Sequence, residues 1–462
     1  MGAPLDSASR LPPGPRGYPL IGALPRLMKD PLAFVREATR DYGDTVRVGA
    51  IGRQHVFLIT HPSHVHYILQ GNNRNYSKGD DFKQIKLIIG DGLVIAEGEE
   101  WRRQRRLMQP AFHKQKIRGL VDAMAKVIGG VREQWAAIPR GEPLDISSEM
   151  MKLAQRVLLR ALLSVEAETE NAELMAAWDE VHGFLSGRLF SIVNLPVALP
   201  FPSHIRFRRA MKKLDDAVKR ILAHRRGSDE GPEDLLSLLL AARDEATGTG
   251  MTAEELRDEV MTIFAAGFET TAVVLAWAWL LVSQHPEVEE KLFAEVDSVL
   301  EGRAPTSEDI PRLRYTKMIL EETMRLYPSA WIFTRTNLEA DTIGGYSIPK
   351  GSLLFVCPYA THRRAEEWQD PEVFSPERFA EACPGRPRFG FYPFGGGPRQ
   401  CIGEAFAMTE MQLVIAIMAQ RFTLRAEPGL AVEPEPLFTL RSRPAIRMTL
   451  SERRGPAGRG PL

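Results

Sequence analysis

The chain carries, near its C-terminus, the stretch Phe394-Gly395-Gly396-Gly397-Pro398-Arg399-Gln400-Cys401-Ile402-Gly403. It places the thiol of Cys401 at the end of a glycine-rich loop, just before an apolar segment from Glu404 to about Met418 with helical character. The positive end of a helix dipole favours a thiolate there, and bare glycines let a large flat ligand approach the backbone. A lone cysteine is more often an inert buried residue, so the spacing Phe-x-x-Gly-x-x-x-Cys-x-Gly carries the functional interpretation.

This spacing resembles the haem-binding loop of the cytochrome P450 family. The resemblance implies that Cys401 is the axial thiolate ligand of haem b (iron-protoporphyrin IX), with Phe394, Arg399 and Gly403 beside the cofactor and O2 as co-substrate. Thiolate ligation pushes electron density onto iron and favours O–O cleavage. The resemblance also implies the fold, which is mainly α with a small β portion and has a long central helix over the haem.

Composition bounds the organisation of the 462-residue chain. No Gly/Ser linker, internal repeat or low-complexity block divides it, so we expect a single haem domain over 1–462 with disordered tails at 1–10 and 451–462. Lysine plus arginine equal aspartate plus glutamate, 59 against 59. This balance gives no support to nucleic acid as a partner.

Cysteine usage and the N-terminal sequence indicate the compartment. Cys357, Cys383 and Cys401 are too few for a disulfide framework and suit a reducing environment. Residues 1–30 lack the basic start and apolar core of a secretory signal, and no spanning segment precedes the proline-rich stretch Pro12-Pro13-Gly14-Pro15. We therefore expect a cytoplasmic, monomeric protein without a membrane anchor.

One segment tests that expectation. The 22 residues from Met261 to Val282 contain a single charge, Glu269, and would pass as a membrane span by hydropathy. A charge near the middle is costly in lipid, and Thr252 with Glu255 three residues later forms the start signal of a longer amphipathic helix. The sequence therefore favours a buried core helix from Thr252 to Gln284.

Elsewhere, helical periodicity dominates. A hairpin is expected early, with strands at Thr45–Val48 and Val56–Thr60 around a turn at Gly52, and further short strands at Phe333–Thr336 and Leu353–Val356. The expected helices are Pro62–Leu69, Glu100–Met108, Ile117–Ala137, Met150–Ser164, Ala172–Leu185, Arg208–Arg225, Asp234–Arg243, Thr252–Gln284, Pro286–Leu300 and Arg314–Leu326.

The central helix contains the polar string Ala266-Gly267-Phe268-Glu269-Thr270-Thr271. Adjacent acid and hydroxyl groups in an apolar helix need a reason, because unpaired buried polar groups are costly. The resemblance implies that Ala266 and Gly267 contact the cofactor, that Gly267 leaves a dent for O2, and that Thr270 and Glu269 are catalytic as a proton relay. The alternative is structural: each threonine bonds back to the carbonyl one turn earlier, and the acid pairs with a distant arginine.

Two further sets of residues match family positions. Glu322 and Arg325 lie at i, i+3 on one helix face, and the resemblance makes them structural, locked to a third residue that matches Arg378. Haem propionates need cations, and guanidinium groups bind carboxylates in a bidentate way. The matching propionate-contact residues are Trp101, Arg105, Arg335 and Arg399.

The run Arg102-Arg103-Gln104-Arg105-Arg106, followed by Lys114, Lys116 and Arg118, is strongly basic. A solvated helix face explains it as well as a docking face does. The resemblance implies that an acidic electron donor docks there, a ferredoxin or flavodoxin with its reductase, steered electrostatically. The chain is too short to add a fused reductase after the haem domain, so a separate donor is expected.

Position in the family pattern also locates a substrate pocket. Its expected lining is apolar and consists of Val94, Phe264, Ala265, Ala330, Trp331, Ile332 and Phe438. Such a lining favours an apolar substrate, of terpenoid or fatty acid type. A fatty acid carboxylate would need a cation near the entrance, for which Arg188, Arg206, Lys83 and Lys86 are candidates.

Taken together, these residues predict a haem-thiolate monooxygenase that hydroxylates an unactivated C–H bond, in which the protein binds, orients and excludes water. A peroxide-dependent haem-thiolate peroxygenase is an alternative, but a peroxide route does not need the relay of Glu269 and Thr270. A haem-based sensor or carrier of apolar ligands is another, which accounts for Cys401 alone.

Overall fold

The computed structural model describes residues 10–18, 21–79, 84–139, 141–164, 168–189, 195–226, 234–244, 247–380 and 387–453. Cys383, Lys83 and the outer parts of both expected tails lie outside these residues. The chain forms two compact units, unit 1 (Met1–Phe82 with Glu322–Cys401) and unit 2 (Lys83–Glu321 with Ile402–Leu462).

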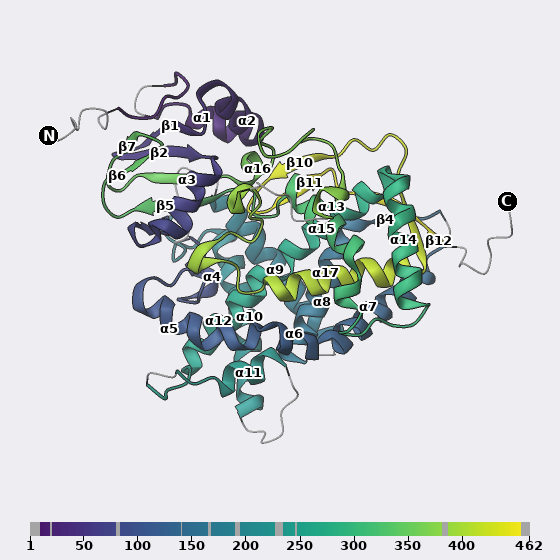
Figure 1. The fold of residues 1–462 in the computed structure, drawn as a ribbon. Coiled ribbons are helices and arrows are strands. Elements are labelled where there is room, and N and C mark those ends of the chain that lie inside the picture. The colour runs from purple at the N-terminus through teal and green to yellow at the C-terminus, as the bar shows by residue number, and fades with distance from the viewer. Residues whose placement is uncertain are drawn as a thin grey trace. The chain divides into compact units, whose positions relative to one another are not determined.

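Unit 1 is built on a five-stranded sheet in the order β1-β2-β8-β5-β3 (Figure 1). Its strands are β1 (Thr45–Ile51), β2 (Gln54–Ile59), β3 (Tyr76–Ser77), β5 (Phe333–Asn337) and β8 (Leu353–Val356). Only β2 and β8 pair in parallel, and the β1–β2 hairpin turns at Gly52, whose φ of 62° suits glycine. Buried Val, Ile and Leu side chains from β2 and β8 fill the core of this unit.

Short elements complete unit 1. They are the helices α1 (Leu24–Lys29), α2 (Pro31–Tyr42), α3 (Pro62–His66) and α16 (Pro358–Thr361), and the hairpin of β6 (Asp341–Ile343) with β7 (Tyr346–Ile348). The carboxylate of Asp341 anchors that hairpin, because Tyr67, Asn72, Asn75 and Tyr76 all donate hydrogen bonds to it.

Unit 2 is mostly helical, which agrees with the predicted fold class. Its helices are α4 (Lys86–Ile89), α5 (Gly98–Met108), α6 (Lys114–Gly119), α7 (Val121–Ala136), α8 (Ile146–Leu163), α9 (Glu168–Leu189), α10 (Pro202–Arg226), α11 (Leu235–Ala241), α12 (Ala253–Gly267), α13 (Glu269–Gln284), α14 (Pro286–Leu300) and α17 (Glu404–Ala419). Helix α15 (Arg314–Leu326) begins in unit 2 and ends in unit 1. In Figure 1, α17 lies alongside α7, with which it packs.

Unit 2 also contains two small sheets. One has the order β4-β12-β9, from Pro143–Asp145, Arg447–Glu452 and Phe422–Ala426, and the other pairs β10 (Glu433–Pro436) with β11 (Leu440–Arg443). Because β12 includes Ser451 and Glu452, the C-terminal tail was predicted to begin two residues too early.

The predicted helix from Thr252 to Gln284 is interrupted, and this corrects the expectation of one continuous element. Thr252 caps α12 through a capping box with Glu255, as expected. The regular helix then stops at Phe268. The hydroxyls of Thr270 and Thr271 donate to the carbonyls one turn earlier, and such side-chain bonds compete with the backbone ladder and bend helices.

The same stretch resolves the membrane alternative. The helical stretch Ala253–Gln284 is long and apolar enough to cross a bilayer, but 78% of its most apolar window is buried inside the protein. Trp277 and Trp279 are both almost fully buried. The stretch is therefore a core element, and its apolar residues are explained by packing.

Candidate active site of a haem-thiolate enzyme

The glycine-rich loop that presents Cys401 is closed by its own backbone. The N–H of Cys401 donates to the carbonyl of Phe394 at 2.9 Å, and Gly397 to Arg399 form a single 3-10 turn, η8. Gly397 has a φ of 69°, and a Cβ there would lie 1.9 Å from the carbonyl oxygen of Leu69. Glycine is therefore required at this position by both backbone conformation and space. The result is an exposed Cys401 at the end of a constrained loop.

Cys357 differs from Cys401 in its accessibility to a ligand. It is fully buried, and its thiol donates to the carbonyl of Trp331 at 3.4 Å. Burial raises the pKa of Cys357 to about 12, so its thiolate is strongly disfavoured. Of the two cysteines in the described part of the chain, only Cys401 is accessible to a ligand.

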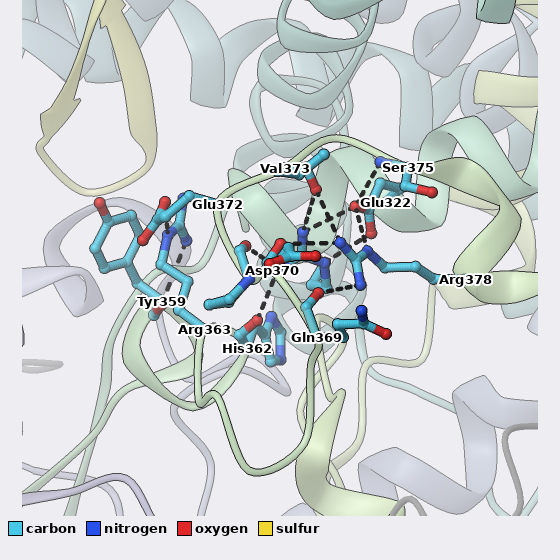
Figure 2. A network of polar contacts seen from close by, with 12 residues as sticks. Glu322, Tyr359, His362, Arg363, Gln369, Asp370, Glu372, Val373, Ser375 and Arg378 are labelled. Carbon is cyan, nitrogen blue, oxygen red and sulfur yellow. Dashed lines mark hydrogen bonds and ion pairs between the residues drawn. The ribbon is translucent and has the colours of Figure 1, made fainter.

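Glu322 and Arg378 lie close together in unit 1 (Figure 2), and Arg325 pairs with the same carboxylate. Arg325 is fully buried and forms a bidentate pair with Glu322 at 2.7 and 2.8 Å. Arg378 approaches the same carboxylate at 3.4 Å, and the backbone N–H of Ser375 donates to it at 2.9 Å. The predicted three-residue contact is therefore present.

The guanidinium of Arg325 also organises the chain that precedes the cysteine loop. It donates to three carbonyls, those of His362 at 3.1 Å, Pro371 at 2.6 Å and Val373 at 3.1 Å. Burial lowers the pKa of His362 to about 3, helped by the nearby charges of Arg325 and Arg363. This imidazole is thus neutral, and its Nε2 accepts the N–H of Tyr392 at 2.9 Å, two residues before Phe394.

In unit 2, the side chain of Thr270 is partly accessible and donates from Oγ1 to the carbonyl of Ala266 at 2.8 Å. Glu269 is 3% exposed and accepts from Thr439 at 2.7 Å and from Nε of Arg441 at 3.0 Å. Its second carboxylate oxygen lies 2.9 Å from Nε2 of His182. The contacts that the structural alternative predicted, a back-bonded threonine and an arginine-paired acid, are therefore present.

Gly267 corrects another expectation. A Cβ added at Gly267 would lie 2.9 Å from a terminal carbon of Leu158 on α8. The space left by the missing side chain is therefore occupied by α8, and it is not a dent for O2. The accessible surface of the helix lies instead at Ala266, which is exposed, and at Ala265, which is half-buried, between the buried Phe264 and Phe268.

The four predicted propionate contacts lie on three elements, two of them on the same helix. Trp101 and Arg105 lie one turn apart on α5, and Nε of Arg105 donates to Gln109 at 3.4 Å. In unit 1, Arg335 on β5 is 8% exposed, donates to the carbonyl of Thr334 and lies over the ring of Phe333. Arg399 ends the turn η8, two residues before Cys401.

The predicted pocket residues differ in accessibility. Phe264 is buried and packs edge-on against Trp178 of α9, whereas Phe438, between β10 and β11, is 41% exposed. Trp331 is buried and its carbonyl is used in hydrogen bonds, but Ala330 before it is exposed. Ile332 and Val94 are half-buried.

Two acids that sequence reasoning missed fix the segment before Val94. Asp258 accepts the N–H of Asp91 at 2.8 Å, and Glu259 accepts the N–H of Leu93 at 3.1 Å. Burial raises the pKa of Glu259 to about 8, so this carboxyl is mostly protonated at neutral pH. Their only sequence signal was a charged start to an apolar helix, which is common on solvated first turns.

The basic run on α5 is largely neutralised by acids. Arg102 pairs with Glu99, Arg103 with Glu255, and Arg106 with the buried Asp244. By contrast, Lys114, Lys116 and Arg118 on α6 are exposed and make no ion pair within the described ranges. The net positive charge of this region therefore lies on α6 and less on α5.

Comparison with known proteins identifies the family to which this chain belongs. The cytochrome P450 family model matches residues 12–447. The chain belongs to the cytochrome P450 family. Cyclooctatin synthase of Streptomyces melanosporofaciens is 38% identical over 94% of both chains, and pentalenene oxygenase of Streptomyces avermitilis is 34% identical over 95% of this chain and 97% of that protein. The crystal structure of the cytochrome P450DA haem domain superposes with a TM-score of 0.88 at 25% identity, covering 98% of this chain and all of that one.

The protein is thus a cytochrome P450 monooxygenase that uses haem b with a cysteine thiolate ligand and O2. Like other members of the family, it depends on redox partners and takes hydrophobic substrates. The peroxygenase and sensor alternatives lose support accordingly. Within unit 1, the accessible thiol of Cys401 fits the thiolate ligand of a haem. Within unit 2, the exposed Ala266 and half-buried Ala265 give the central helix an accessible apolar surface.

The buried ion pair of Glu322 with Arg325 yields a test of stability. Glu322→Gln leaves the guanidinium of Arg325 buried without its counter-charge, so we expect a loss of about 3–5 kcal/mol in the free energy of unfolding. Glu321→Gln is the matched control, because Glu321 pairs with Lys317 at the surface and should cost no more than about 0.5 kcal/mol. Urea unfolding of the two variants measures the difference, and equal losses would contradict a central role for Glu322.

Proposed function

We propose that this monooxygenase hydroxylates a terpenoid or a similar neutral hydrocarbon. Three of the cations considered for a fatty acid carboxylate lie in the described part of the chain, and all three already have partners. Arg188 donates to Gln84 and to the carbonyl of Leu195, Arg206 pairs with Glu180, and Lys86 pairs with Asp91. The observation that carries the proposal is that Arg188, Arg206 and Lys86 each already have a hydrogen-bond or ion-pair partner.

Similar proteins support the same substrate class. Cyclooctat-9-en-7-ol 5-monooxygenase of Streptomyces melanosporofaciens is 36% identical over 90% of both chains, and pentalenene oxygenase is named for a hydrocarbon. The apolar character of Val94, Phe264 and Ile332 is consistent with such a substrate. The protein would then bind its substrate by apolar contact and exclude water from it.

We further propose that Cys401 is the thiolate ligand and that residues 1–462 act as a single haem domain. Support comes from the accessible thiol of Cys401, the buried thiol of Cys357 and the family pattern around the loop. When bound, the haem supplies the chemistry of O2 activation and C–H oxidation. Trp101, Arg105, Arg335 and Arg399 would hold its propionates, since arginine binds carboxylates in a bidentate way.

Thr270 and Glu269 would move the protons that oxygen activation consumes. The hydroxyl of Thr270 donates to the carbonyl of Ala266, and its lone pairs can still accept a hydrogen bond from a water molecule. Its partly accessible position suits that role, and the neighbouring open face at Ala266 leaves room for a ligand. Glu269 is buried one residue earlier and would pass the proton inward.

Cysteine variants test the ligand. Cys401→Ser should remove the red-shifted Soret band that a thiolate ligand gives to the ferrous carbon monoxide complex, and should abolish oxygenation. Cys357→Ser is the matched control and should keep both, because the Cys357 thiol is buried and protonated. Retention of the thiolate spectrum in Cys401→Ser would exclude Cys401 as the ligand.

Binding titrations test the substrate class. Ferric protein is titrated with a series of cyclic terpene hydrocarbons and alcohols and, in parallel, with a fatty acid series of matched carbon number. We expect a shift of the Soret band to the high-spin position with terpenes at micromolar concentration, and at least about tenfold weaker binding of fatty acids, since an unpaired carboxylate is costly to desolvate. A larger shift with the fatty acids would overturn the terpenoid proposal.

We also propose a separate ferredoxin or flavodoxin, with its reductase, as the electron donor of a monomeric, cytoplasmic enzyme. The predicted docking face at Arg102–Arg106 is here extended to Lys114, Lys116 and Arg118, which carry its unpaired charge. Acidic donors approach such a face faster at low ionic strength.

Charge variants test this docking surface. Replacing Lys114, Lys116 and Arg118 together by alanine should lower the rate constant for reduction by an acidic ferredoxin about tenfold at low salt and flatten its salt dependence. The control removes the same charge from α10, with alanine at Lys213, Lys219 and Arg220, which are also exposed. Equal effects of the two triple variants would indicate net charge alone and would contradict docking at α6.

A further inference from the structure

The carboxyl group of Glu269 is held in its ionised form by its neighbours. Burial alone would raise the pKa of Glu269, but the hydrogen bond and charge of His182, with Arg441 and Thr439, lower it to about 2. At neutral pH this carboxyl group is therefore ionised. A proton path through Glu269 therefore needs a neighbouring group that supplies the proton at the moment of transfer.

His182 is the described side chain in contact with Glu269 that can do so. Its Nε2 lies 2.9 Å from Oε2 of Glu269 and 3.2 Å from Nη2 of Arg441. A carboxylate can only accept a hydrogen bond and a guanidinium can only donate one. The nitrogen is therefore bonded to Glu269 when it carries a proton, and to Arg441 when it does not.

The position of His182 is fixed by packing. Trp178 lies one turn earlier on α9, and its ring packs edge-on against Phe264 and Phe268 at centroid distances of 5.1 and 5.5 Å. Phe268 directly precedes Glu269 and Phe264 lies five residues before it. The contact of Trp178 with these rings therefore also brings the imidazole, one turn later on α9, to the carboxylate. The His182 side chain keeps 15% of its surface exposed, which gives it access to water.

Two charged groups contact His182 in the described part of the chain, Glu269 from α13 and Arg441 from β11. Phe264 of α12 and Phe268, which follows that helix, pack against Trp178. On α9 itself, Asp179 is exposed, and Glu180 forms an ion pair with Arg206 of α10. The hairpin that carries Arg441 is in turn held to α13, because Trp277 donates to the carbonyl of Leu440 at 2.9 Å.

We propose that His182 is a positioning residue for oxygen activation, which supplies the proton to Glu269. In this step the Nε2–H bond of the imidazolium breaks and an O–H bond forms on Oε2. The neutral ring then accepts an N–H of Arg441 until a water proton restores it. One proton moves and no electron does. This inference rests on the proposed roles of Glu269 and Thr270.

The sign of the pH dependence follows from this order. The proton donor in this order is the imidazolium form of the ring, which is depleted as the pH rises, whereas Glu269 stays ionised. Product formed per reductant consumed should therefore fall as pH rises, with the balance appearing as peroxide.

His182→Gln separates proton supply from packing. Glutamine has an amide N–H that can still donate to Glu269, but it does not titrate. With the terpene that gives the largest spin shift, we expect unchanged substrate affinity and unfolding midpoint. We also expect product per reductant to fall about tenfold at pH 6.5, lose its pH dependence between 5.5 and 8.5, and show a larger solvent isotope effect.

Two companion variants keep the result interpretable. His285→Gln changes an imidazole at the other end of α13, whose Nδ1 contacts the carbonyl of Leu281, and should leave the pH profile unchanged. Thr270→Ala should uncouple at every pH. Uncoupling in Thr270→Ala with a wild-type profile in His182→Gln would overturn this inference alone, whereas coupled turnover in both variants would remove the relay from the proposed function.

If His182→Gln fails to fold, the wild-type protein still decides. Product per reductant that is constant from pH 5.5 to 8.5 in the wild-type enzyme would overturn a titrating proton supply.

Discussion

A charge withdrawn from water must be compensated by the groups around it, and unit 1 is arranged around one such charge. The guanidinium of Arg325 has no exposed surface, yet every direction in which it donates meets a carboxylate or a carbonyl oxygen. Those carbonyls belong to a segment without regular secondary structure between α16 and the cysteine loop. Arg325 thus substitutes for the backbone ladder that such a segment lacks, and it does so because arginine offers five donors in a rigid fork.

Glu269 in unit 2 meets the same requirement with a different outcome. Its partners come from α9 and from the strand β11, and one of them is an imidazole whose charge depends on pH. Arg325 is held by a carboxylate and backbone carbonyls, whereas the surroundings of Glu269 include an imidazole, which can both donate and accept a proton. The first arrangement therefore fixes a conformation, and the second can respond to proton supply.

Local signals explain how much of the fold the sequence could predict. Pro286 at a first turn and the capping box at Thr252 set helix starts correctly, and Arg314–Leu326 was predicted with both ends correct. The break at Phe268 was missed because it depends on hydroxyl groups that compete with the backbone, a competition that tertiary packing decides. The same holds for the start of α8, where Asp145 caps a helix that begins at Ile146, four residues before the predicted start.

The residues of the candidate site also differ in whether the sequence alone could reveal them. Cys401, Glu322 and Arg325 were found because their spacing along the chain reflects their roles. His182 was not, because it is a single histidine 87 residues before Glu269, and nothing in its own helix marks it. Its contact depends on how Trp178 seats α9, which is a property of packing between distant segments.

The close approach of Leu158 to Gly267 has a consequence for variation at this helix. The two residues share one volume, so a side chain can be gained at position 267 only if position 158 becomes smaller. Sequences that diverge here are expected to change both positions together, with a bulky residue on one helix matched by a small one on the other. The pair thus sets the distance between the helix backbone at Gly267 and α8. A change of side-chain size at position 158 would therefore shift the accessible surface at Ala266 from the opposite side of the helix.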